Sequence, residues 1–135
     1  MVLFHYTGHV PANTTELEPF HERVKMQRGT IIQWIPYQPD ECADQVKFWV
    51  EYHGMQIFPW NRDEWAYGFF IPIPIPDKID FNVPPYVLDF FAINEDDSFE
   101  HEYHVYVNVE PSSPVVIPTP SQSILDRFRS MLGGE

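Results

Sequence analysis

The chain has 135 residues, of which 44% are hydrophobic and 16% aromatic, so it can fill the core of one compact domain. Asp and Glu number 20 against 8 Lys and Arg, and the resulting charge of −12 argues against binding to nucleic acid or to a membrane. One cysteine excludes an intrachain disulfide framework and a cysteine-rich zinc site. The first residues lack the basic and long apolar stretches of a signal peptide, so we expect synthesis in the cytoplasm.

Fourteen prolines leave few windows for a long helix and divide the chain into short segments rich in β-branched and aromatic residues. In residues 45–52, for example, apolar and polar side chains alternate, which is typical of a half-buried strand. His53 and Gly54 then predict a turn. We expect strands in residues 2–6, 23–26, 30–35 (stopping at Pro36), 45–52, 55–58, 69–75, 86–93 and 101–109.

Prolines and isoleucines alternate in residues 68–76. In an extended chain, Pro72, Pro74 and Pro76 place their missing N–H groups along one edge, which predicts an edge strand protected against the addition of another strand. The same spacing places four apolar side chains on one face: Phe69, Ile71, Ile73 and Ile75. A polyproline-like loop is the alternative.

These patterns predict an all-β fold in residues 1–110, an antiparallel β-sandwich of six to eight strands. Its topology would be immunoglobulin-like or jelly-roll-like. The polar residues 94–98 are expected to form a hairpin turn between the last two strands.

The composition changes after the last predicted strand. Residues 111–120 form a proline-rich strap, and residues 121–135 predict a short amphipathic helix that docks on another surface. This tail has no net charge, so residues 1–120 carry the whole −12. The tail either folds back onto its own domain or reaches a neighbouring subunit. Its apolar stripe consists of Ile124, Leu125, Phe128, Met131 and Leu132.

No residue is assigned a catalytic, cofactor-binding or metal-binding role. His101 and His104 are three residues apart on a predicted strand, so they point to opposite faces and cannot easily share an ion. No nucleophile motif, phosphate-binding glycine loop or metalloprotease motif occurs. Asn94, Glu95, Asp96 and Asp97 offer oxygen ligands for Ca²⁺, but they lack the Asp-x-Asp-x-Asp-Gly spacing of a calcium-binding loop, which favours a solvated hairpin tip.

Aromatic residues gather around a charged turn in the segment Trp60–Tyr67, and Trp49 lies on the polar face of its strand. Flat rings of this kind can stack on sugars, and tryptophan also anchors protein interfaces. We select Trp60 and Trp65 as protein-interface residues. A glycan-binding or Ca²⁺-binding module is the alternative.

Four motifs stand out: Gly29-Thr-Ile-Ile, Gln56-Ile-Phe-Pro-Trp-Asn, Pro84-Pro-Tyr, and Asn94-Glu-Asp-Asp with His101 and Val105-Tyr-Val-Asn-Val109. Together they resemble the small β-sandwich accessory proteins of tailed phages over roughly residues 10–110, and they are also similar to bacterial immunoglobulin-like domains. The resemblance implies a non-enzymatic virion component, a capsid-decorating or tail-associated subunit without cofactor. Its partners would be other protein subunits, in a homo-oligomer or in a capsid or tail lattice.

Overall fold

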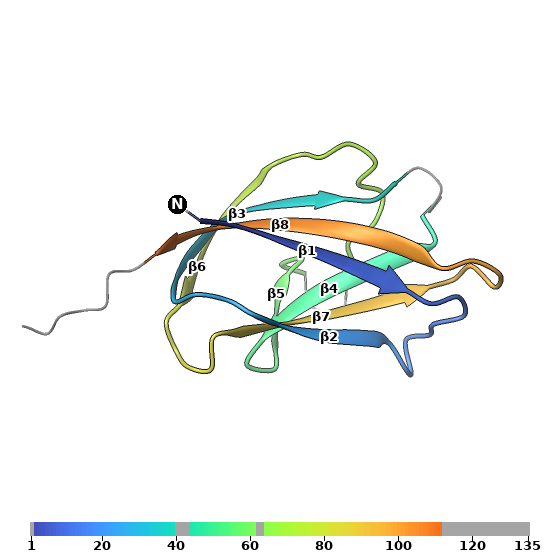
Figure 1. Ribbon diagram of the computed structural model, residues 1–135, viewed down its shortest axis with the longest axis horizontal. Helices are drawn as coiled ribbons and strands as arrows, with labels where there is room; N and C mark the ends of the chain where they lie inside the picture. Colours follow the sequence, from blue (N-terminus) through green and yellow to red (C-terminus); the bar gives the residue numbers. More distant parts are fainter. Residues whose placement is uncertain (1, 40–43, 62–63, 112–135) are drawn as a thin grey trace, which may run out of the picture.

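The computed structural model describes residues 2–39, 44–61 and 64–111, which form two facing antiparallel sheets (Figure 1). The predicted β-sandwich is therefore confirmed, with eight strands and no helix in the described residues. The predicted strap beyond Pro111 and the predicted helix at 121–135 lie outside the described residues. The strands are β1 (Val2–Val10), β2 (Phe20–Lys25), β3 (Gly29–Tyr37), β4 (Val46–Tyr52), β5 (Met55–Phe58), β6 (Ile75–Phe81), β7 (Val87–Asn94) and β8 (His101–Pro111).

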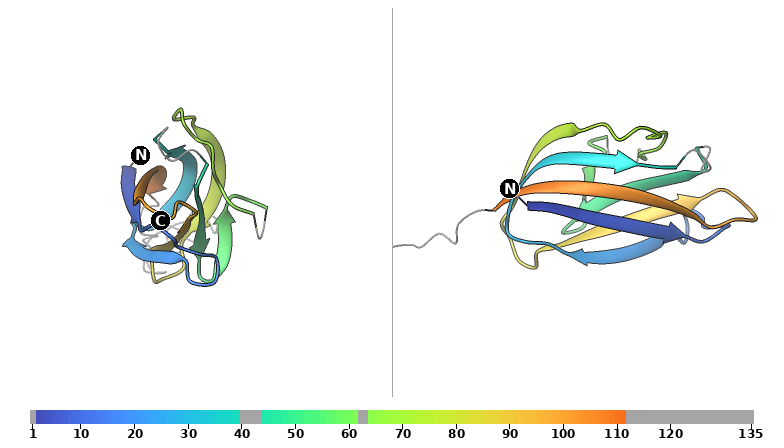
Figure 2. Two further views of the ribbon diagram at one scale, coloured as in Figure 1. Left: turned by 90° about the vertical axis from the view of Figure 1, so that its right-hand side faces the viewer. Right: turned by 45° about the horizontal axis from the view of Figure 1, so that its top comes forward.

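One sheet has the order β1-β8-β3-β6 and the other β2-β7-β4-β5. The first strand thus pairs with the last, the second with the seventh, the third with the sixth and the fourth with the fifth. These nested pairs form one long antiparallel hairpin whose strand pairs are divided between the two sheets. Val2 lies opposite Val109, so the start of β1 and the end of β8 meet at one end of the sandwich (Figure 2).

The core lies between the sheets because the strands alternate as the sequence predicts. In β4 the side chains of Val46, Phe48 and Val50 are buried, and β8 buries every second residue from His101 to Val109. Aromatic rings link the two layers: Phe48 of one sheet stacks on Tyr103 of the other with ring centroids 4.7 Å apart, and Tyr6 stacks on Phe90 at 4.1 Å.

The predicted turn between β4 and β5 is also confirmed. His53 and Gly54 both have positive φ angles, 51° and 75°, as a tight two-residue hairpin turn requires. A Cβ atom added at Gly54 would meet no other atom within 4 Å. Glycine is therefore favoured at this position by the positive φ angle and not by a lack of space.

The prediction of an edge strand across residues 68–76 was wrong in position. The edge strand is β6, which begins only at Ile75, and the side chains of Ile71 and Ile73 are exposed instead of sharing a buried face. Prolines remove hydrogen-bond donors and hold the preceding residue extended, so this stretch instead crosses between the sheets. Pro76 lies in β6 opposite Gln33, whereas Pro72 and Pro74 precede the strand.

Two further expectations need correction. The polar segment after Asn94 is not a hairpin within one sheet, because β7 and β8 belong to different sheets. The strand predicted to stop at Pro36 continues to Tyr37. Beyond Trp34, β3 pairs with β8 and no longer with β6, and a proline is tolerated where one side of a strand lacks a partner.

Candidate binding site on the outer face of a sheet

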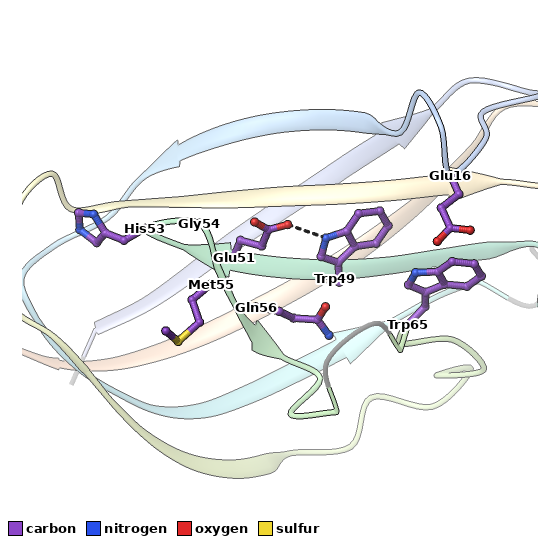
Figure 3. A pocket seen from close by; sticks show the side chains of 8 residues that line it. All are labelled: Glu16, Trp49, Glu51, His53, Gly54, Met55, Gln56 and Trp65. Carbon is purple, nitrogen blue, oxygen red and sulfur yellow. Dashed lines mark hydrogen bonds between the residues drawn. The ribbon is translucent and has the colours of Figure 1, made fainter.

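A hollow of about 580 Å³ lies on the outer face of the β2-β7-β4-β5 sheet (Figure 3). Because Val46, Phe48 and Val50 point into the core, the alternate residues Trp49 and Glu51 point outward into this hollow. We call it the tryptophan hollow. Its lining consists of Glu16, Trp49, Glu51, His53, Gly54, Met55, Gln56 and Trp65.

The two indole rings are held in place by separate contacts. The Nε1–H of Trp49 donates a 2.9 Å hydrogen bond to Glu51 Oε2, which Figure 3 shows at the edge of the hollow. Trp65 comes from the segment between β5 and β6, and its neighbour Ala66 exchanges backbone hydrogen bonds of 2.8 and 3.0 Å with Phe48. The ring centroids are 6.5 Å apart with planes inclined by 27°. These contacts fix the rings before any ligand arrives, which reduces the entropic cost of binding.

Polar groups from distant parts of the chain complete the lining. Glu16 is brought there because Thr14 exchanges two 3.1 Å backbone hydrogen bonds with Asn94 at the end of β7. Gln56 Nε2 lies 3.0–3.1 Å from the backbone oxygens of Pro59, Asn61 and Glu64 and so secures the loop before Trp65. The lining therefore offers two carboxylates and an amide beside two indole faces, a combination suited to cations and to hydrogen-bond donors.

The aromatic surface extends across the sheet beyond the hollow. His21 stacks on Phe91 at 4.3 Å and Phe91 on Trp49 at 5.2 Å, following the strand order β2-β7-β4. Partial burial raises the pKa of Asp89, but hydrogen bonds from His21 and Arg23 outweigh this effect and hold the pKa below its usual value. The Asp89 carboxylate thus links β7 to His21 and Arg23 of the neighbouring strand β2.

The side chain of Lys47 lies over the ring of Trp65. Its Nζ lies 5.4 Å from the ring centroids of both Trp65 and Tyr67, and 2.8 Å from Glu95 Oε1. The ring of Trp65 therefore already attracts one positive charge, and a carboxylate neutralises that charge.

Two smaller hollows adjoin the tryptophan hollow. One of about 370 Å³ shares Glu16 and Trp65 with it and reaches to Asn94, and we call it the Asn94 hollow. The other, of about 300 Å³, shares Met55 and Gln56 with it, and we call it the Trp60 hollow. Its remaining lining combines the apolar side chains of Ile57, Trp60 and Ile79 with the charged side chains of Lys78 and Asp80. Shared residues join the three into one elongated surface.

The structure separates the two tryptophans predicted as interface residues. Trp60 is 74% exposed, and its Nε1 donates a 3.2 Å hydrogen bond to Asp77 Oδ1 in β6. Trp65 is half-buried in the tryptophan hollow. The other predicted interface residues, Ile124, Leu125, Phe128, Met131 and Leu132, lie outside the described residues.

The turn at 94–97, a candidate Ca²⁺ site, uses its oxygens internally. Asn94 is fully buried and donates from Nδ2 to the backbone oxygens of Val10 and Phe99. Asp96 Oδ1 accepts hydrogen bonds from the N–H groups of Ser98 and Phe99, and Asp96 Oδ2 lies 2.7 Å from His101 Nε2. These contacts tie the end of β7 to the start of β8.

Asp96 gives the fold a dependence on pH. The N–H of Ser98, and then His101, hold the pKa of Asp96 below its ordinary value of 3.8, so the ionised carboxylate stabilises the folded state. This contribution is complete above pH 3.8 and is lost as the pH falls below it. We expect Asp96→Asn to lower the free energy of unfolding at pH 7 and to lose less further stability between pH 5 and pH 3 than the wild type does.

Urea unfolding at several pH values measures this effect. Asp97→Asn in the same turn is the matched control and should follow the wild-type profile. A deficit of Asp96→Asn that stays constant from pH 7 to pH 3 would contradict the assignment.

Comparison with family models, curated proteins and solved structures found no match. Over residues 2–39, 44–61 and 64–111, no group of three or more His, Cys, Asp or Glu side chains is placed to hold a metal ion. Within the same ranges no helix is long and apolar enough to cross a membrane.

Proposed function

We propose that this chain is a non-enzymatic structural protein that binds neighbouring protein subunits through its C-terminal tail and its sandwich surface. Following the resemblance to phage accessory proteins, its place would be the virion, as a capsid-decorating or tail-associated subunit that forms homo-oligomers. Attachment of this kind requires an exposed apolar surface and needs no reacting group.

The observation that carries the proposal is the number of exposed apolar side chains in one stretch of the sequence. Residues 55–73 hold five of the nine large hydrophobic side chains that are exposed in the described chain. In Figure 1 the segment that follows β5 runs along the outside of the sandwich to β6. Exposure of these apolar side chains to water is unfavourable, and a protein partner that covers them would remove this cost. We call these side chains the apolar surface: Met55 (56% exposed), Trp60 (74%), Tyr67 (54%), Ile71 (70%) and Ile73 (54%).

The strand order gives independent support. We infer that the sandwich is a jelly roll, because neighbouring pairs β1–β8, β2–β7, β3–β6 and β4–β5 arise when one long hairpin wraps into two sheets. Jelly rolls occur in viral capsid proteins and in lectins. This argument is an analogy of fold and raises the expectation for assembly or binding without identifying the partner.

A substitution on the apolar surface tests the proposal. We expect Trp60→Ser to weaken self-association of the whole chain at least tenfold, because exposed tryptophans at interfaces commonly contribute more than about 1.4 kcal/mol. Sedimentation equilibrium at several concentrations measures the effect. Phe99→Ser is the matched control, since Phe99 is 67% exposed but lies before β8 in sequence and outside the apolar surface. Equal association of both variants and wild type would argue against this interface.

Glycan binding is the second candidate, favoured by the two indole rings in a hollow of about 580 Å³. The carboxylates of the lining would select neutral or amino sugars over acidic ones. A neutral oligosaccharide that raises the melting temperature of the chain, and no longer does so after Trp65→Ala, would favour this candidate. The Ca²⁺ alternative is weaker, because Asp96 already accepts three hydrogen bonds from the protein.

A further inference from the structure

We propose that the elongated surface formed by the three joined hollows is the docking site for residues 121–135 of a second copy of this chain, with Arg127 or Arg129 entering the tryptophan hollow. This inference rests on the proposed function and specifies which surfaces meet in the homo-oligomer. The occupant is argued from charge, from the order of the hollows and from where the described chain ends.

Charge complementarity is the first argument. The tryptophan hollow and the Asn94 hollow together present Glu16, Glu51 and Glu95, and no Lys or Arg belongs to either lining. Glu95 is the one carboxylate of these three that is paired with a lysine, Lys47. A guanidinium group can hydrogen-bond a carboxylate and lie on an indole face at the same time, which an ammonium group does less well.

The tail has the matching composition. Residues 121–135 carry two arginines and two acids, so they are neutral, whereas residues 1–120 carry the whole −12. Two copies of the acidic part repel each other, and the tail approaches without this cost. Arg127 and Arg129 flank Phe128, so positive charge and apolar surface alternate in the sequence.

The order of the hollows matches such a segment. The acidic tryptophan hollow adjoins the Trp60 hollow through Met55 and Gln56, and the Trp60 hollow combines apolar side chains with the opposite charges of Lys78 and Asp80. A segment lying along both can place its arginines beside the carboxylates and its apolar side chains against Trp60, Ile57 and Ile79. The apolar residues available in the tail are Ile124, Leu125, Phe128, Met131 and Leu132.

The direction of the chain favours a neighbour over the same molecule. β8 ends at Pro111 in the β1-β8-β3-β6 sheet (Figure 1). The tryptophan hollow lies on the outer face of the opposite sheet (Figure 3). The 24 residues from 112 to 135 span at most about 80 Å. To reach its own hollow the tail must pass around the sandwich, whereas a second copy can present its hollow directly. Every copy carries both surfaces, so the exchange can be reciprocal in a closed dimer or continue around a ring.

A charge-reversal experiment on the whole chain tests the pairing. We expect Glu16→Arg to weaken self-association at least tenfold, and Arg127→Glu and Arg129→Glu each to weaken it as well. Combining Glu16→Arg with Arg127→Glu or with Arg129→Glu restores the opposite charges, so at least one of the two combinations should bind within about threefold of wild type. Sedimentation equilibrium in low salt measures all of these constants, and wild-type association should weaken as salt is added.

Glu100→Arg is the matched control, because its side chain is also exposed but lies before β8, away from the three hollows. It should associate as wild type does. Urea unfolding of Glu16→Arg verifies that its sandwich is intact, and the arginine variants alter no residue of the sandwich.

The possible outcomes separate this inference from the function on which it rests. If wild type associates but Glu16→Arg has no effect, or neither combination recovers binding, the docking site is wrong while the proposed attachment function stands. If wild type remains monomeric at all concentrations, the homo-oligomer itself is wrong, and docking to a second copy with it.

Discussion

Replacing Trp34 with alanine should lower the free energy of unfolding by about 3–5 kcal/mol, the largest effect expected for one substitution in this chain. The indole is completely buried, stacks on Phe58 with centroids 5.0 Å apart, and donates a 2.9 Å hydrogen bond from Nε1 to Asp77 Oδ2. Alanine would leave a large cavity between the two sheets and remove one of the hydrogen-bond donors of that carboxylate. Domains of this size have total stabilities of about 5–15 kcal/mol, so the variant would lose a large share of its stability.

Urea unfolding followed by circular dichroism measures this loss. Trp60→Ser is the matched control, because Trp60 is exposed and donates to the same aspartate, Asp77. Its stability should remain within about 0.5 kcal/mol of wild type. A loss of under 1 kcal/mol in Trp34→Ala would mean that Trp34 does not fill the space between the sheets.

Removing residues 112–135 should leave the sandwich folded and abolish self-association. All eight strands are retained in a chain that ends at Pro111, including the pairing of β8 with both β1 and β3. The deleted part contains the apolar stripe and both arginines of the proposed docking segment, so the second copy loses its contact. Differential scanning calorimetry and sedimentation of the shortened chain measure the two effects together.

The melting temperature and the mass of the shortened chain together distinguish three cases. A shortened chain that melts within a few degrees of wild type and is monomeric supports a tail that acts between molecules. A shortened chain that unfolds would show that the tail stabilises its own sandwich. Unchanged association after the deletion would assign the contact to the sandwich surface alone.

Local sequence patterns predicted the strands that bury one face, because buried apolar and outward-facing side chains alternate along them. The alternation in β4 and β8 and the turn at His53 and Gly54 are local, and each was confirmed by burial or by backbone angles. The isoleucines before β6 also alternate, yet Ile71 and Ile73 are exposed. Alternation says which side chains share a face of an extended chain, but it does not say whether another strand or layer covers that face.

The candidate site was less predictable, because it depends on which strands become neighbours. Trp49 was visible as an aromatic residue on a polar strand face, and Trp65 as part of an aromatic cluster. No sequence pattern pointed to Glu16 as a site residue, because its position depends on the pairing of Thr14 with Asn94, eighty residues away in sequence. The order of the eight strands is a property of the whole chain, and the same local patterns are compatible with an immunoglobulin-like order.

The central claim is that this acidic sandwich exists to attach to other copies through surfaces in the chain itself. Light-scattering mass of the purified whole chain, measured over a wide range of concentrations in low salt, tests it most directly. Our account predicts a mass that rises from 15.9 kDa to a defined multiple as the concentration increases. A mass that stays at 15.9 kDa at every concentration would contradict it.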